Sequence, residues 1–208
     1  LTNIVQATGG TITPTSITSS TTKLATTFGI SAESITSDYI SEANSNTAKL
    51  VHQIDVLVNT LSSAINDPIV NKDTIMSSLA NTIVNTTENI TINLSNSNNI
   101  TTIIAQVSTD NISVTIDSTV NTNSVSFISN VNTILSNIDT ATKSFNNVFT
   151  EATQIAVASD TITSDINTNF NNTVAPPTPI EINEASISSV IVPSPTIIQI
   201  GMNYYEHS

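Results

Sequence analysis

Two pieces of sequence decide the fold: TPTSITSSTTKLATTFG at residues 13–29 and SNTAKLVHQIDVLVNTLSSAINDP at residues 45–68. In the first piece, Thr13 and Pro14 predict the N-cap and the first residue of a helix, and Gly29 predicts its end. In the second piece, the opening serine predicts an N-cap, the closing proline predicts a stop, and apolar residues recur between them every third or fourth position. Each piece therefore predicts an amphipathic helix, and the two helices are expected to pack together.

A third helix is predicted a few residues further on. Asp73 is the expected N-cap, and apolar residues from Ile75 to Val84 fall on one helical face. The connection to the preceding helix is short, which predicts an antiparallel helical hairpin.

The pattern changes between residues 88 and 117. Ile90, Ile92 and Leu94 alternate with polar residues, as is typical of a half-buried strand. We therefore expect a short β or irregular insertion in this region. The apolar residues at 100–107 fit either a short helix or a strand, and the sequence leaves both open.

The longest periodic pattern runs from Val120 to Ile166, where apolar residues fall on a 3.5-residue grid. One long helix or two helices that fold back would produce it, and Asn146-Asn147 is the expected break. Few charges flank the stripe, which favours a helix hairpin in a monomeric bundle over an intermolecular coiled coil. The predicted fold class is therefore mainly α, a bundle of about four to six helices.

The chain is expected to divide into a lead-in segment at 1–12, a helical body at 13–175, and a proline-rich linker with a tail at 176–208. Prolines 176, 177 and 179 predict an extended linker, and the apolar residues beyond them predict a β-strand-like tail. Such a tail can complete a neighbouring subunit's sheet or groove, although it can also fold back on its own body. The predicted subunit-contact residues are Ile182, Ile187, Val190, Val192, Ile197, Ile198 and Ile200.

The composition restricts the partners and the compartment. The 208 residues include 16 acidic residues, four lysines and no arginine, with a net charge of -12. Nucleic acid is therefore an unfavourable partner, because binding its phosphates requires a cluster of cations. No apolar run is long enough to span a bilayer, so we expect no membrane insertion. Ser, Thr and Asn make up about 44% of the residues, and we interpret this polar but weakly charged composition as that of an extracellular or cell-surface protein.

The sequence predicts no catalytic site. It has no glycine-rich phosphate loop, no serine elbow and no pair of histidines at metal-ligand spacing. His52 has no evident partner for general base catalysis and is expected to face away from the apolar stripe of its helix. The closest carboxylate pairs of interest are Asp160 with Asp165 and Asp110 with Asp117. Oxygen ligands for Ca²⁺ are abundant, so calcium is the one cofactor that we consider, without named ligands.

Several short motifs carry a resemblance to a known group of proteins. They are Ile12-Thr13-Pro14-Thr15, the run from Leu24 to Ile30, Asp38, Ala43-Asn44, Ala48 and Gln53-Ile54. Together, over residues 12–64, they resemble a helical domain of large secreted bacterial surface proteins that also carry cadherin-like or calcium-binding repeats. The resemblance implies a surface adhesin or matrix segment. The chain lacks the glycine- and aspartate-rich repeats of such proteins, so calcium binding does not follow from the resemblance.

These observations together predict a non-enzymatic structural subunit of an extracellular bacterial filament, sheath or adhesive surface layer. Self-assembly would use apolar helix faces and the C-terminal tail. The alternatives are a viral or phage fibre or capsid protein that uses the long stripe for coiling, and a monomeric ligand-binding segment of an adhesin.

Overall fold

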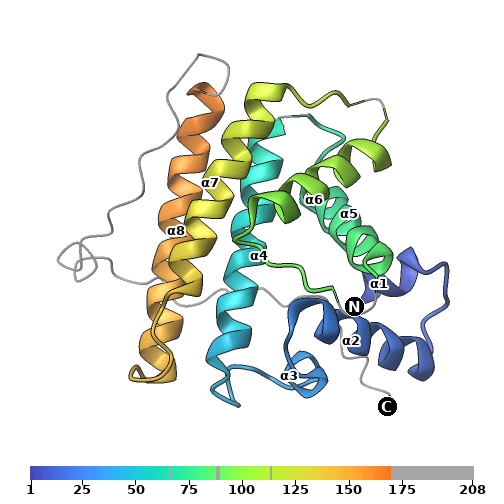
Figure 1. Cartoon of the computed structure of the whole chain (residues 1–208), viewed down its shortest axis with the longest axis vertical. Coiled ribbons are helices and arrows are strands. Elements are labelled where there is room, and N and C mark those ends of the chain that lie inside the picture. The colour runs from blue at the N-terminus through green and yellow to red at the C-terminus, as the bar shows by residue number, and fades with distance from the viewer. Residues whose placement is uncertain (66, 88–89, 113, 170–208) are drawn as a thin grey trace, which may run out of the picture.

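The computed structural model describes residues 1–65, 67–87, 90–112 and 114–169, with side chains as far as residue 163. These residues form a bundle of eight α-helices and contain no β-strand (Figure 1). The mainly helical class is confirmed, while the expected number of helices was too low. The helices are α1 (Thr2–Ala7), α2 (Pro14–Phe28), α3 (Ala32–Thr36), α4 (Ser45–Ile65), α5 (Lys72–Asn85), α6 (Ser97–Asp110), α7 (Ser118–Ser136) and α8 (Phe145–Asn169).

Helix α2 begins and ends at the predicted residues. The Thr13 hydroxyl accepts a hydrogen bond from the Ser16 N–H, and the Ser16 hydroxyl accepts one from the Thr13 N–H, which makes a capping box. Pro14 occupies the first helical position. Gly29 follows the helix with a φ of 66°, a left-handed conformation that glycine adopts without steric cost.

The caps of α4 and α5 differ from the prediction. Asn44, one residue before the expected Ser45, accepts a hydrogen bond from the Thr47 N–H. Asn71 caps α5 in place of Asp73 by accepting a hydrogen bond from the Thr74 N–H. In both places several residues with good capping side chains are adjacent in the sequence, so composition alone could not select the right one. Asp73 lies in the first turn of α5, where its charge suits the helix dipole.

Helix α4 is the centre of the bundle and is buried on two faces. It packs mainly against α8 and α7, and it also contacts α5 (Figure 1). The adjacent residues Val56 and Leu57 are both 0% exposed, yet they belong to different parts of the core. Val56 joins Phe127, Val131, Val148 and other residues of α7 and α8. Leu57 joins the larger cluster, which includes the buried residues of α5 and α6.

The described part of the region 88–117 contains a helix with irregular connections on both sides. Of the two expected alternatives, the β insertion is therefore wrong there, while the irregular one agrees with these connections. Helix α6 places Ile100, Ile103, Ile104 and Val107 in the core, which settles the open choice in favour of a helix. Of the alternating residues before it, Ile92 and Leu94 are buried and Ile90 is 53% exposed, and they do not pair into a sheet. Ile92 is buried and its N–H donates to the Thr27 carbonyl oxygen at the end of α2. The alternation therefore reflects the burial of Ile92 and Leu94 in an irregular segment.

The long stripe from 120 to 166 is divided between α7 and α8, which lie side by side as a hairpin (Figure 1). The break lies at residues 137–144, and the expected break at Asn146-Asn147 is wrong because both residues belong to the first turn of α8. Asp139 forms the turn by accepting hydrogen bonds from the N–H groups of Ala141 and Thr142. A side chain–backbone turn of this kind is not visible in apolar periodicity.

The N-terminal segment that was expected to lead into the body contains α1, which packs mainly on α5 and buries Ile4 and Val5. The linker and tail at 176–208, with all seven predicted contact residues, lie outside the described residues. Among the described helices, none combines the length and the hydropathy needed to cross a membrane.

Candidate functional site

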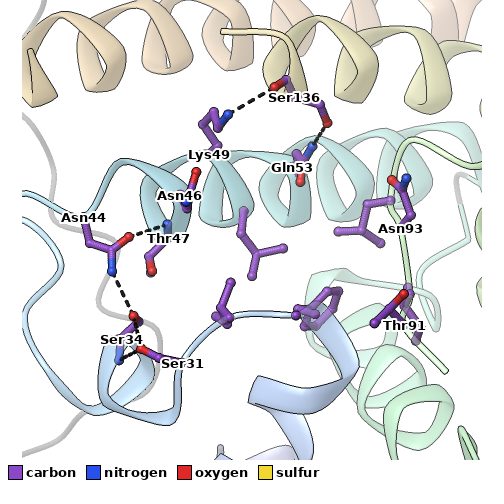
Figure 2. Close-up of a pocket in the computed structure, with 16 residues that line it drawn as sticks. Ser31, Ser34, Asn44, Asn46, Thr47, Lys49, Gln53, Thr91, Asn93 and Ser136 are labelled. Atoms are coloured by element: carbon purple, nitrogen blue, oxygen red, sulfur yellow. Dashed lines mark hydrogen bonds between the residues drawn. The ribbon is translucent and has the colours of Figure 1, made fainter. Parts of the chain in front are cut away.

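A groove with a volume of about 560 Å³ opens beside the first turns of α4 (Figure 2). The end of α2, the start of α3 and the irregular segment at 91–94 form its other walls, and Ser136 at the end of α7 reaches it. The lining residues are Phe28, Gly29, Ile30, Ser31, Ser34, Asn44, Asn46, Thr47, Lys49, Leu50, Gln53, Thr91, Ile92, Asn93, Leu94 and Ser136.

One side of the groove is held by the Asn44 side chain, which connects α3 to α4 (Figure 2). Its Nδ2 donates to the Ser34 hydroxyl over 2.8 Å, and its Oδ1 accepts from the Thr47 N–H over 3.0 Å. The Ser31 hydroxyl in turn accepts from the Ser34 N–H. These bonds fix the position of the α4 N-terminus relative to α3.

Thr47 on that side carries one of several buried hydroxyls that have no hydrogen-bond partner among the described residues. The residue is 6% exposed, and its Oγ1 has no hydrogen-bond partner among the described residues. A buried hydroxyl without a partner costs about 1–3 kcal/mol. The first N–H groups of an α-helix also lack partners within the helix. The Asn44 side chain accepts a hydrogen bond from the Thr47 N–H group and so satisfies one of these donors.

Lys49 points to the side of α4 opposite Thr47 (Figure 2) and is the only charged residue among the described residues that line the groove. Its ammonium donates to the carbonyl oxygens of Ser136 and Ile138, at 3.1 and 3.3 Å, where the carbonyl groups at the end of α7 need donors. Burial lowers the pKa of Lys49. Gln53 lies one turn further along α4 and donates from Nε2 to the Ser136 hydroxyl and the Asn132 carbonyl oxygen.

Sequence reasoning did not find this groove. Its polar lining consists of serine, threonine, asparagine and glutamine apart from Lys49, and the first three of these residue types make up almost half of the chain. They therefore carry no signal at any one position. Lys49 was the single distinctive residue, because cations are rare in this sequence.

His52 was expected to face away from the apolar stripe of α4, and the structure places its ring against α8. Its ring centroid lies 5.6 Å from that of Phe149, and its Nε2 lies 3.3 Å from the Thr153 hydroxyl. Burial lowers its pKa to about 4, so the ring is neutral at pH 7. The neutral ring is half-buried between α4 and α8.

The structure pairs the carboxylates differently from the sequence. Asp160 lies near Asp55, and Asn59 Nδ2 donates to both, at 2.8 and 3.1 Å. Desolvation raises the pKa of both carboxyl groups, and the Asp160 charge raises that of Asp55 further. The positive charge of Lys72 lowers the pKa of both carboxyl groups. The Asp165 side chain lies outside the described side chains.

The second carboxylate pair that the sequence suggested, Asp110 with Asp117, does not form a pair in the structure either. Asp110 accepts hydrogen bonds from Asn81 and Gln106, whereas Asp117 caps α7. The Thr119 and Val120 N–H groups lower the pKa of Asp117. Within the described part of the chain, no group of three histidine, aspartate or glutamate side chains could hold a metal ion, and calcium binding stays a prediction.

Comparisons with family models, with curated proteins and with solved structures found no match for the chain. The resemblance over residues 12–64 to secreted bacterial surface proteins therefore stays a prediction.

Proposed function

We propose that the chain is a non-enzymatic structural subunit of an extracellular bacterial filament, sheath or adhesive surface layer, and that its C-terminal tail makes the contacts between subunits. The observation that supports this proposal is that most of the buried apolar side chains that the structure describes, which run from Ile4 to Ala156, pack against one another in two clusters within the helical body.

The helix faces that were expected to contribute to assembly are used inside the body. Phe127, Val131 and Val148 on α7 and α8 pack against α4, so this stripe offers little for a coiled coil between chains and gives no support to the fibre alternative. The exposed large apolar residues of the body lie on different elements and connections, such as Ile12, Ile69 and Ile112. Single exposed apolar residues are normal on a protein surface and do not mark an interface.

The tail is the remaining apolar segment. Its seven predicted contact residues are all isoleucine or valine, and full burial of each would contribute about 1.5–3 kcal/mol. A net charge of -12 opposes contact between copies at low salt. Salt or calcium would screen this repulsion, so assembly is expected to depend on one or the other.

The test compares the full chain with a chain that ends at Ala175, by negative-stain electron microscopy and sedimentation, in calcium and in chelator. Full chain that forms ordered polymers, with truncated chain that stays monomeric, supports the proposal. Equal polymerisation of both chains contradicts a role for the tail, and monomers in every condition contradict assembly. Val190→Asn with Ile198→Asn tests the tail within the full chain, and Ile112→Asn is the control, because Ile112 is 93% exposed on the body.

A further inference from the structure

We propose that α8 is an exchangeable helix: in an open form of the chain α7 and α8 make one continuous helix, and α8 then packs on α4 of a second copy. The inference concerns the helical body and does not depend on contacts through the tail. It stands on three features: an apolar stripe that keeps its register through the α7–α8 turn, a turn without a helix breaker, and a core to which α8 contributes separately.

The apolar stripe of α7 and α8 keeps its register through the turn that separates them. Between Ile134 in α7 and Val148 in α8, the positions on the 3.5-residue grid are Ile138, Ala141 and Phe145. All three are apolar, although Ala141 is exposed in the turn. A turn interrupts the helical phase, so two helices that only fold back have no need of a common register. The stripe therefore fits one continuous helix as well as it fits the hairpin.

Nothing in the sequence of the turn stops a helix. Neither glycine nor proline occurs in the turn at 137–144, or anywhere else from residue 118 to residue 169. By contrast, α2 ends at Gly29 and the α4–α5 connection contains Pro68, and residues of these two types commonly end helices. The segment from 118 to 169 can therefore form a single helix, about 78 Å long at about 1.5 Å per residue.

The turn is held by the side chain of Asp139. Its carboxylate accepts hydrogen bonds from the N–H groups of Ala141 and Thr142, at 2.8 and 3.2 Å, and the Thr142 hydroxyl also donates to it. In a continuous helix the two N–H groups would donate to the carbonyl oxygens of Asn137 and Ile138, four residues earlier. The backbone groups therefore have partners in both forms, and the closed form depends on one exposed side chain.

Helix α8 contributes separately to the core. Its buried apolar residues Val148, Ala152, Ile155 and Ala156 belong to the smaller cluster, together with Val56 and residues of α7. Among the described residues, the larger cluster contains none from α8. Release of α8 thus leaves the larger cluster closed and opens only the faces that α8 covers. Proteins commonly open in such cooperative units, at a smaller cost than global unfolding.

The partner that suits the opened face is the α8 of a second copy. Helix α8 lies at the edge of the bundle and packs mainly on α4, with far less contact to α7, to which the turn joins it (Figure 1). In a continuous α7–α8 helix, α8 points away from its own α4. Two open chains restore both interfaces by exchange, with the same contacts as in the closed chain, such as that of Asn59 with Asp160. The free energy of the dimer relative to two closed chains therefore depends mainly on the turn.

The test asks whether α8 of one chain packs on α4 of another. The chain contains no cysteine, so Asp55→Cys and Asp160→Cys each carry a single thiol. The two positions face each other across the interface, because Asn59 Nδ2 donates to both carboxylates, at 3.1 and 2.8 Å. The two variants are mixed in urea, refolded together in salt at about 1 mM chain, where a dimer with a Kd of about 1 mM is still well populated, and treated with a short bifunctional thiol reagent. We expect a cross-linked dimer. Asp55→Cys mixed with Ile112→Cys should give none, because exchange does not bring Ile112 to α4.

The first variant of the turn should abolish exchange. Thr140→Pro places a proline inside the continuous helix, which it would break. The closed turn accommodates proline, because the α4–α5 connection makes the same turn with Asp67 and Pro68, where the Ile69 N–H donates to the Asp67 carboxylate over 2.8 Å. The Thr140 N–H also makes no hydrogen bond among the described residues that proline would remove.

The second variant should favour exchange. Asp139→Ala removes the hydrogen bonds of the closed turn and supplies a strong helix former. We expect the dimerisation constant, measured by sedimentation, to rise at least about tenfold, because two turns open per dimer and each has lost charge-assisted hydrogen bonds. Asp67→Ala is the matched control. It loses the same kind of bond, but Pro68 still prevents a continuous helix, so dimerisation should not increase.

Three results would overturn the inference: no cross-link between the Asp55→Cys and Asp160→Cys chains, a cross-link that Thr140→Pro leaves undiminished, or an Asp139→Ala chain that dimerises no more than Asp67→Ala. The cross-link is also measured in chains that carry Val190→Asn and Ile198→Asn. Exchange of α8 predicts that it persists there, and its loss would assign the association to the tail and overturn the inference. Polymers seen by microscopy report on the tail alone, so the two proposals fail separately.

Discussion

Replacement of His52 by glutamine should change how the stability of the body depends on pH. The folded-state pKa of His52 is about 4 because of burial, while an unfolded chain has a histidine pKa of about 6.5. As the pH falls below 6.5, the unfolded chain takes up a proton that the folded chain refuses, so stability is lost as the solution becomes more acidic. At pH 5 this linkage amounts to about 2 kcal/mol. The partly exposed ring reduces the expected value to about 1–2 kcal/mol.

The assay is urea unfolding at pH 7.5, 6.5, 5.5 and 5.0 at constant ionic strength, followed by circular dichroism. The wild-type chain should lose about 1–2 kcal/mol more than His52→Gln between pH 7.5 and 5.0, which is a midpoint shift of about 0.5–1 M urea. The Asp55 and Asp160 carboxyl groups act in the opposite direction, because their raised pKa values let the folded chain take up protons first. The two chains share these groups, so the difference between them isolates His52. Parallel pH profiles for the two chains would refute the argument.

Two further predictions concern the core and the carboxylates. Phe127→Ala should lower the free energy of unfolding by about 3–5 kcal/mol, since Phe127 is 2% exposed between α4, α7 and α8; Ile112→Ala, at a 93% exposed position, should change it by less than about 0.5 kcal/mol in the same urea assay. Burial and the nearby Asp160 charge raise the pKa of Asp55, so its charged form is unfavourable in the folded chain at pH 7. Asp55→Asn removes this charge and should raise the stability at pH 7. It should also remove the part of the stability that the wild-type chain gains when Asp55 takes up a proton at lower pH. A thermal melt at pH 7 that is lower for Asp55→Asn than for the wild type would contradict this assignment.

The sequence was sufficient to predict those helices in which periodicity and stop signals agree. Helix α2 has Thr13, Pro14 and Gly29 at its ends, and the apolar stripe of α4 has no competing pattern. The predictions failed where two local signals competed. At residues 90–94 the alternation is genuine and Ile92 and Leu94 are buried, but a strand also needs a partner strand, and the sequence does not show whether one exists.

The groove could not be predicted because it depends on how distant segments meet. Gly29, Asn44, Asn93 and Ser136 come from four parts of the chain, and nothing in the local sequence around each of them indicates that they meet. The same holds for the contact of Asn59 with Asp160, which joins residues 101 positions apart. Short-range patterns report which face of a helix is buried, and they do not report which helix covers it.

The polar composition explains why the helices depend on their packing. Threonine and serine have modest helix propensity because their hydroxyls compete for backbone groups. Here many hydroxyls bond to the carbonyl oxygen four residues earlier, as Thr18 does with Pro14 and Thr133 with Ser129. The exposed faces of the helices then need few charges, and charged residues make up only 10% of the chain. A body held together by apolar burial and neutral hydrogen bonds should keep its stability when salt is raised. Salt can therefore screen the repulsion between subunits without unfolding them, which the proposed assembly of a chain with a net charge of -12 requires.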